Sequence, residues 1–181
     1  STIHTELNIE KGNYGVLTLH RPSNVDEKEA FSRILDALEQ IGSKIPLVFP
    51  LHPRTKNRAE QFGLTNRLES IPNIVLTGPA GYLDFVALMA ESKLVLTDSG
   101  GLQEETTALG IPCLTLRENT ERPITVTEGT NTIVGNDTEA ILNAAFDILE
   151  NGGKAGRIPE LWDGYTAIRI ADIIVDTIRN D

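Results

Sequence analysis

Short apolar runs alternate along the chain with longer segments in which apolar residues recur at helical spacing. The apolar runs, each expected to form a strand, cover residues 16–19, 45–49, 73–76, 94–97, 113–116 and 132–134. Predicted helices cover residues 27–41, 55–62, 82–90 and 101–109, a segment from Asp137, and a last segment after Gly164. Strands that are apolar on both faces and alternate with helices are typical of a parallel sheet covered on both sides. We therefore expect an α/β domain with a doubly wound, Rossmann-like, mostly parallel six-stranded sheet.

The pattern also predicts several helix ends and faces. Asp26 and Glu29 have the spacing of a capping box, in which Asp26 caps the helix and Glu29 reaches back. The apolar stripe behind them predicts a buried face made of Phe31, Ile34, Leu35, Leu38 and Ile41. The last helix carries a stripe made of Ile168, Ala171, Ile174, Val175 and Ile178. Residues 117–129 and 151–163 are expected to be irregular loops long enough to have a function.

The net charge of −10 on 181 residues narrows the possible partners of what is expected to be a single domain, residues 1–181. Nucleic acids and anionic membrane surfaces need a basic face, so we expect neither as a partner. An anionic small molecule remains possible, because local donors rather than net charge hold such a group.

The lone cysteine, Cys113, lies in an apolar run and is expected to be a small buried side chain. Without an apolar run of about 20 residues or a visible signal peptide, the chain is expected to be cytoplasmic.

Candidate binding residues follow the ends of the predicted strands. In doubly wound sheets, ligands bind beyond the carboxyl ends of the strands, where the strand order reverses. The residues at those ends are His20-Arg21, His52-Pro53-Arg54, Gly78-Pro79, residues 98–101 and residues 117–122. Two of the three histidines and several arginines thus fall on one edge of an acidic protein. This concentration predicts a binding site for an anionic ligand at that edge.

The stretch TDSGGLQEE, residues 97–105, places Ser99, Gly100 and Gly101 where a strand gives way to a helix. The first turn of a helix offers unpaired N–H groups and a partial positive charge, which together can bind an anion. Glycine lets a phosphate oxygen approach those groups without meeting a Cβ, and Ser99 adds a hydroxyl. The alternative is that Ser99 only caps the helix and the glycines only relieve crowding in a turn. The spacing is neither a dinucleotide fingerprint nor a Walker loop.

Two adjacent acids, Glu104 and Glu105, stand one turn into the same helix. One of them could accept hydrogen bonds from paired sugar hydroxyls, as acids do on a ribose in other nucleotide folds. Both could equally be solvated acids favoured by the helix dipole. Because neighbouring residues point about 100° apart on a helix, at most one is expected to face a ligand. The spacing alone leaves the choice between them open.

The histidines and carboxylates show no metal-ligand spacing, so we expect neither a metal site nor a cofactor. His20 ends a strand on the predicted ligand edge, where a functional and a structural role are equally compatible with its position. His52 is explained by its turn with Pro53 as the end of a strand. His4 lies in a polar leader, and no role is expected for it.

Six motifs along nearly the whole chain resemble the non-hydrolysing UDP-N-acetylglucosamine 2-epimerases. They are HRPSNVD (20–26), HPR (52–54), GYLDFVALM (81–89), TDSGGLQEE (97–105), RENTERPITVTEGTN (117–131) and LWDG (161–164). Members of that family have two Rossmann-like domains in a GT-B-type architecture, with the substrate in the cleft between them. The resemblance implies that this chain is the C-terminal, UDP-binding domain of a homodimeric enzyme, and that the N-terminal domain is a missing partner.

The resemblance also implies roles for particular residues. Ser99, Gly100 and Gly101 would hold the diphosphate, in agreement with the argument from the helix start, and Arg122 would support the site. The ribose hydroxyls would bind Glu105 rather than Glu104.

Two further residues complete the site that the resemblance implies. Phe85 and its neighbouring loop would contact the uracil, largely through backbone atoms. His20 would be the catalytic candidate, near the diphosphate and the reacting sugar.

The reaction implied by the resemblance interconverts UDP-N-acetylglucosamine and UDP-N-acetylmannosamine. UDP leaves by elimination and re-adds after protonation of carbon 2 on the other face, which needs acid and base groups and stabilisation of the leaving diphosphate. The family's acid and base carboxylates come mainly from the N-terminal domain, so the chain alone is expected to be inactive. Ser23 stands where many members have an acid that forms a regulatory substrate site, so we do not expect that regulation here.

Two other functions compete with this interpretation. The chain could be the donor domain of a GT-B glycosyltransferase, because fold alone does not separate the two reactions. It could also be a nucleotide-binding module without catalysis. The Thr-Glu-Arg-Pro loop, residues 120–123, and the His20 motif favour the epimerase.

Overall fold

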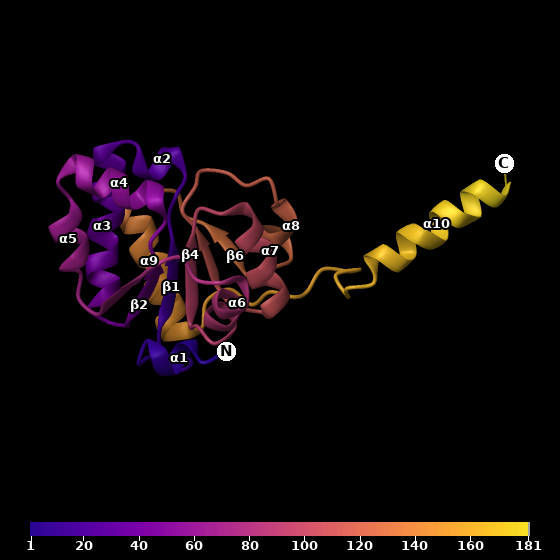
Figure 1. Cartoon of the computed structure of the whole chain (residues 1–181), viewed down its shortest axis with the longest axis horizontal. Helices are drawn as coiled ribbons and strands as arrows, with labels where there is room; N and C mark the ends of the chain where they lie inside the picture. The colour runs from indigo at the N-terminus through magenta and orange to yellow at the C-terminus, as the bar shows by residue number, and fades with distance from the viewer. Residues whose placement is uncertain (181) are drawn as a thin grey trace.

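The computed structural model describes residues 1–180, with side chains through residue 179, and shows one six-stranded sheet (Figure 1). Every pairing in the sheet is parallel, and the strand order is β3-β2-β1-β4-β5-β6. The strands are β1 Gly15–Thr18, β2 Leu47–Pro50, β3 Ile74–Thr77, β4 Leu94–Thr97, β5 Cys113–Thr115 and β6 Asn131–Ile133. The predicted doubly wound, Rossmann-like sheet is confirmed, and its strand order reverses between β1 and β4.

Helices cover both faces of the sheet, which explains why its strands are apolar throughout. The helices are α1 Ile3–Glu6, α2 Pro22–Val25, α3 Lys28–Gly42, α4 Pro53–Phe62, α5 Thr65–Glu69, α6 Tyr82–Ala90, α7 Gly100–Leu109, α8 Pro123–Thr127, α9 Thr138–Asn151 and α10 Thr166–Asn180. On one face, Leu17 and Leu96 pack in a core with α3, α4, α5 and α9. On the other, Val16 and Val95 pack with α6, and α1 and α7 lie against them. Alternate residues of β1, β2, β3 and β4 thus contribute to two separate cores.

The start of α3 differs from the predicted capping box. The helix begins at Lys28, and its N-cap residue Glu27 makes no side-chain capping bond. Asp26 instead ends the short helix α2 and accepts hydrogen bonds from the guanidinium groups of Arg54 and Arg58. Three charge-assisted bonds from two arginines of α4 are stronger than one bond to a backbone N–H, so Asp26 pairs with these arginines instead of capping α3.

The two predicted loops have different outcomes. Residues 117–129 contain the short helix α8, which begins at Pro123, a residue well suited to the first position of a helix. Of residues 151–163, Asn151 is the last residue of α9, and residues 152–163 contain neither helix nor strand, as predicted.

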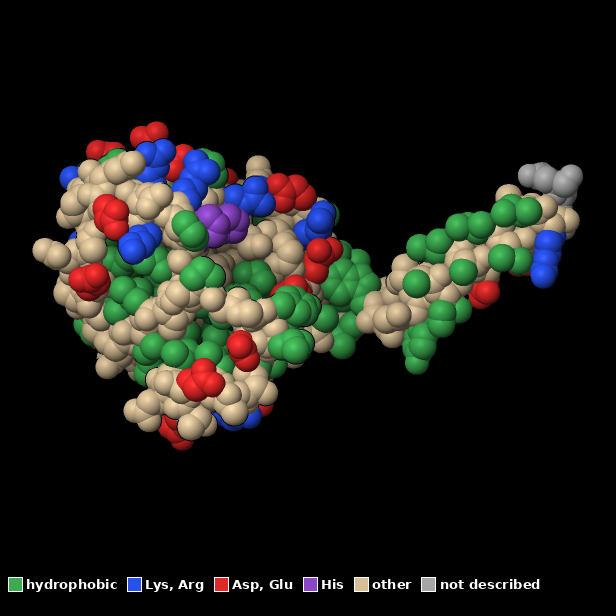
Figure 2. Space-filling view, in the orientation of Figure 1, with side chains coloured by type: hydrophobic (Ala, Val, Ile, Leu, Met, Phe, Trp, Pro, Cys, Tyr) green, Lys and Arg blue, Asp and Glu red, His purple; other side chains and the backbone are tan. Residues whose placement is uncertain are grey.

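The last helix, α10, projects away from the body of the domain at the end of residues 152–165 (Figure 1). Its apolar side chains are therefore solvent-exposed, and Figure 2 shows them along the projecting helix. We call them the α10 stripe: Ile168, Ile170, Ile173, Ile174, Val175 and Ile178. The apolar pattern correctly predicted the helix, but the stripe packs on neither face of the sheet. Within residues 1–180, no helix combines the length and the apolar character needed to cross a bilayer.

Substitutions to alanine in α3 and α10 are expected to have very different effects on the free energy of unfolding. Leu38 is fully buried in the α3 core, so Leu38→Ala should lower the free energy of unfolding by about 2–5 kcal/mol. Ile173 is 65% exposed, so Ile173→Ala should change it by less than about 0.5 kcal/mol. Urea titrations followed by circular dichroism measure both values. Similar losses in the two variants would mean that α10 packs against the body of the chain in solution.

Candidate functional site

A cavity of about 470 Å³ opens at the carboxyl ends of β1, β2 and β4, beside the point where the strand order reverses. This is where doubly wound sheets bind ligands. Its lining is Thr18, Leu19, His20, Pro50, Leu51, His52, Pro53, Pro79, Ala80, Phe85, Ser99 and Leu102. The structure thus brings three predicted site residues, His20, Phe85 and Ser99, to one cavity. The other four, at positions 100, 101, 105 and 122, lie on α7 or in the loop after β5.

The first turn of α7 leaves its backbone open. Ser99 is the N-cap residue, but it makes no side-chain capping bond, and its hydroxyl has no hydrogen-bond partner within residues 1–180. A Cβ added at Gly101 would meet no atom within 4 Å, and one added at Gly100 would meet only a carboxylate oxygen of Glu121 at 3.6 Å. Neither glycine has a positive φ. Neither crowding nor backbone conformation therefore requires glycine here, which argues against the simple cap-and-turn alternative.

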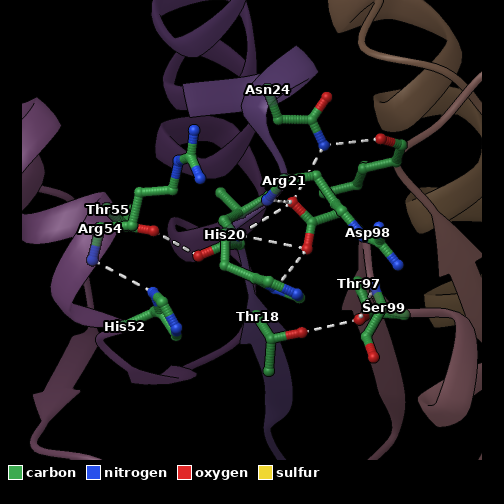
Figure 3. Close-up of polar contacts among 12 residues, drawn as sticks. Thr18, His20, Arg21, Asn24, His52, Arg54, Thr55, Thr97, Asp98 and Ser99 are labelled. Atoms are coloured by element: carbon green, nitrogen blue, oxygen red, sulfur yellow. Dashed lines mark hydrogen bonds and ion pairs between the residues drawn. The ribbon is translucent and has the colours of Figure 1, made fainter. Parts of the chain in front are cut away.

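A buried carboxylate, Asp98, joins the loop after β1 to the end of β4 (Figure 3). Its Oδ2 accepts hydrogen bonds from the backbone N–H groups of His20 at 2.9 Å and Arg21 at 2.8 Å, and from Nδ2 of Asn24 at 3.2 Å. Its Oδ1 lies 2.9 Å from Nδ1 of His20. The Asn24 amide also donates to the carbonyl of Leu116, 2.7 Å away, just after β5. Asp98 and Asn24 therefore fix the ends of β1, β4 and β5 relative to one another.

The environment of Asp98 keeps it ionised. Burial alone would raise its pKa, but the hydrogen bonds from His20 and Arg21 outweigh burial and hold the pKa below its usual value. Sequence reasoning placed this residue at a strand end and gave it no role. The available signal was an acid directly after the apolar β4 strand, at the edge where ligands bind.

The imidazoles of His20 and His52 lie next to each other at the cavity, with ring centroids 5.3 Å apart. Nδ1 of His52 accepts a hydrogen bond from the backbone N–H of Arg54 at 3.1 Å (Figure 3). His52 ends its strand as predicted, but it also lines the cavity, which the turn argument missed. His4 is buried far from this edge, and its Nε2 lies 2.8 Å from the hydroxyl of Tyr14.

Most of the arginines at the carboxyl ends of the strands form ion pairs with acidic residues, so this edge of the sheet is less positive than its number of arginines suggests. Arg54 and Arg58 share the carboxylate of Asp26. Arg117 binds Glu121, with Nη2 and Oε1 2.8 Å apart. Figure 2 shows the resulting mixture of acidic and basic side chains around the histidines. Net positive charge is therefore a weaker feature of this edge than its open backbone donors.

The structure separates the two adjacent acids of α7. Glu104 forms an ion pair with Arg122, with Oε1 and Nε 3.1 Å apart. Glu105 is half-buried, and its Oε2 is buried without a hydrogen-bond partner in the described part of the chain. Burial first, and the nearby charge of Glu104 second, raise the pKa of Glu105. Glu105 is thus the acid with free acceptor capacity, whereas Glu104 holds the predicted site residue Arg122.

A buried amide, Gln103, connects the start of α7 to the loop that carries Arg122. Its Nε2 donates to the carbonyl of Ser99 at 3.3 Å. Its Oε1 accepts from the hydroxyl of Thr120 and from Nδ2 of Asn131 at 3.1 Å. The backbone N–H of Arg122 in turn donates to the Thr120 hydroxyl at 2.9 Å. This network, which sequence reasoning did not identify, holds the loop against α7.

Cys113 is fully buried in β5, as expected for a small apolar side chain. Burial raises the pKa of its thiol to about 11, which keeps the thiol protonated and unreactive.

Comparisons with known proteins agree with this geometry. A family model described as UDP-N-acetylglucosamine 2-epimerase matches residues 1–175. A UDP-N-acetylglucosamine 2-epimerase of Methanococcus maripaludis is 44% identical over 140 residues, which are 76% of this chain and 38% of that protein. A UDP-2,3-diacetamido-2,3-dideoxy-D-glucuronate 2-epimerase of Pseudomonas aeruginosa is 41% identical over 129 residues, covering 71% of this chain and 35% of that protein. The chain spans less than half the length of these curated relatives.

Solved structures show the same relationship. The crystal structure of the Methanocaldococcus jannaschii UDP-GlcNAc 2-epimerase in complex with UDP-GlcNAc and UDP matches with a TM-score of 0.85 and 38% identity. The match covers 97% of this chain and 48% of that one. An Escherichia coli heptosyltransferase shares the fold alone, with a TM-score of 0.52 and 20% identity over 83% of this chain and 47% of that one. The predicted Rossmann-like domain of GT-B type is thereby confirmed, and the chain belongs to the UDP-N-acetylglucosamine 2-epimerase family.

Proposed function

We propose that this chain is the UDP-sugar-binding half of a non-hydrolysing epimerase that interconverts UDP-N-acetylglucosamine and UDP-N-acetylmannosamine. The observation that carries the proposal is the open first turn of α7, which adjoins a cavity beside His20 in a chain of this family. The Methanocaldococcus relative was crystallised with UDP-GlcNAc and UDP, which supports a ligand of the same class here.

In the proposed complex, the diphosphate lies on the start of α7. The N–H groups of Gly100 and Gly101 and the free hydroxyl of Ser99 would donate to its oxygens, aided by the partial positive charge of the helix start. Arg122 would add a cation from the side, oriented by Glu104. An acidic chain can hold a diphosphate in this way because the donors are local.

The nucleoside would occupy the neighbouring surface. The carboxylate of Glu105 makes no hydrogen bond within residues 1–180, so it retains the capacity to accept hydrogen bonds from the two ribose hydroxyls. Phe85, on α6, lines the cavity and offers an apolar surface to the uracil. His20 would lie by the diphosphate and the reacting sugar. These placements use the part of the ligand that all UDP-sugars share, including the one named for the Pseudomonas relative.

The proposed reaction needs two sets of groups. In the elimination step, the proton on carbon 2 goes to a base and the bond between carbon 1 and the diphosphate oxygen breaks, with its electron pair leaving on UDP. Re-addition of UDP follows protonation of carbon 2 on the opposite face. The residues that line the cavity in residues 1–180 include no Asp or Glu, so the chain supplies the leaving-group half of this chemistry.

We propose that the proton-transfer half belongs to an N-terminal domain, in an enzyme that is a homodimer. The relatives are more than twice the length of the region they share with this chain, which leaves room for such a domain. The exposed α10 stripe offers an apolar surface for it.

A donor domain of a glycosyltransferase is the second candidate, favoured only by the shared fold of the heptosyltransferase. Exchange of the proton on carbon 2 separates the two reactions, because glycosyl transfer leaves that carbon untouched.

UDP binding tests the placement of the diphosphate. Ser99→Ala and Arg122→Ala should each weaken UDP binding by about 1–3 kcal/mol, the scale of a charge-assisted contact. Lys93→Ala is the control, because this exposed cation precedes β4, at the opposite edge of the sheet from Ser99. Isothermal titration calorimetry measures all three. Unchanged affinity in both site variants would contradict the proposed diphosphate position.

Deuterium exchange tests whether the proton-transfer groups lie outside this chain. In heavy water, the 181-residue chain should bind UDP-N-acetylglucosamine without incorporating deuterium at carbon 2, because it lacks the proton-transfer carboxylates. Proton NMR of the recovered sugar nucleotide measures incorporation, with the Methanocaldococcus epimerase as the positive control. Deuterium at carbon 2 after incubation with this chain alone would show that the chain carries its own base.

A further inference from the structure

The buried position of Asp98 determines which nitrogen of His20 carries a proton. An ionised carboxylate can only accept hydrogen bonds, and every contact of Asp98 in the described part of the chain comes from a donor group or from the His20 ring. Nδ1 of His20 lies 2.9 Å from Oδ1 of Asp98. Nδ1 must therefore carry a hydrogen, and the neutral ring has its lone pair on Nε2.

Nε2 of His20 is the atom left for a ligand. It has no hydrogen-bond partner within residues 1–180, and the side chain is 34% exposed where it lines the cavity. His52 has the opposite arrangement, because its Nδ1 accepts from the N–H of Arg54 and its neutral ring must carry the hydrogen on Nε2. The two neighbouring rings thus offer the cavity one acceptor and one donor.

We propose that Asp98 is a positioning residue, which fixes His20 in the Nδ1–H form and presents Nε2 as a hydrogen-bond acceptor to the hydroxyl groups of the ligand's sugar. The proposal rests on the proposed function for the identity of the ligand, but not for the state of the ring. The carboxylate has two separable tasks. Oδ2 holds the backbone of residues 20 and 21, and Oδ1, which also lies 3.2 Å from the backbone nitrogen of His20, orients the imidazole (Figure 3).

Asp98→Asn should separate these tasks. The amide oxygen can keep the bonds to the two backbone N–H groups, which leaves the amide NH₂ facing the imidazole. An NH₂ group donates, so Nδ1 of His20 would have to accept and the hydrogen would move to Nε2. A carboxylate that orients a histidine in a catalytic triad shows this loss of the correct tautomer on the same substitution.

The ring state can be read directly by NMR. The 181-residue chain, labelled with ¹⁵N in its histidines, is examined by two-bond ¹H–¹⁵N correlation about two pH units above the ordinary histidine pKa of about 6.5. His20→Gln and His52→Gln assign the signals. We expect wild-type His20 to show the Nδ1–H pattern and His52 the Nε2–H pattern. An Nε2–H pattern for His20 in the wild type would overturn the proposal, whether or not any Asp98 variant folds.

The variants then test the cause. In Asp98→Asn, the His20 pattern should switch to Nε2–H while the His52 pattern stays the same and serves as an internal reference. Asp26→Asn is the matched control, because it replaces a carboxylate on the same edge that pairs with Arg54 and Arg58 instead of a histidine. It should leave both rings unchanged. A folded Asp98→Asn chain that keeps the Nδ1–H form of His20 would also contradict the proposal.

Titration with UDP-N-acetylglucosamine separates this inference from the proposed function. The hydroxyl groups of its sugar can donate to Nε2, so this ligand should shift the Nε2 resonance of wild-type His20, and should bind Asp98→Asn about tenfold more weakly, the size of one misdirected hydrogen bond. Equal affinity for wild type and variant would remove the ligand-facing role of Asp98. Failure of UDP-N-acetylglucosamine to bind the wild type would count against the proposed function, while the tautomer result would stand on its own.

Discussion

The cavity edge of this domain depends on one buried charged group, the carboxylate of Asp98. Burying an ionised carboxylate costs several kcal/mol unless hydrogen bonds replace its water. Here two backbone N–H groups, the Asn24 amide and the His20 ring replace it. These donors come from the loop after β1 and from the helix α2 that follows it, whereas the carboxylate precedes Ser99 at the start of α7. The same contact that satisfies the charge therefore sets the distance between the cavity histidine and the open helix start.

The electrostatics of the edge follow from local geometry rather than from the net charge of −10. Its arginines bind acids of the same edge, so their charge is mostly compensated before any ligand arrives. Within residues 1–180, the donors without protein partners near the cavity include the Ser99 hydroxyl at the start of α7 and Nε of Arg21. An anionic ligand would therefore be bound chiefly by directed hydrogen bonds, which discriminate by shape and are less sensitive to salt than a diffuse positive field.

The sheet was predictable from sequence because both its faces are buried, which makes each strand a continuous apolar run. The open turn at Gly100 and Gly101 was predictable because glycine at a helix start is a local signal. Contacts between distant segments were not predictable. Asp26 does not form the predicted capping box because it binds arginines about 30 residues away. Nothing near Asp98 in the sequence shows that its partners are His20 and Asn24. Likewise, the choice of Glu105 over Glu104 depends on an ion pair with Arg122.

The α10 stripe shows how a correct local prediction can leave the tertiary structure open. Apolar spacing specifies a helix but not the surface that covers it. A helix of 15 residues is only marginally stable alone in water, and most helical stability in proteins comes from packing an apolar face. In α10 that face is exposed over most of its length. The helix thus has the sequence of a packed element without a packing surface within residues 1–180. A second domain, which the relatives' greater length allows and which we propose above, would resolve this contradiction by burying the stripe.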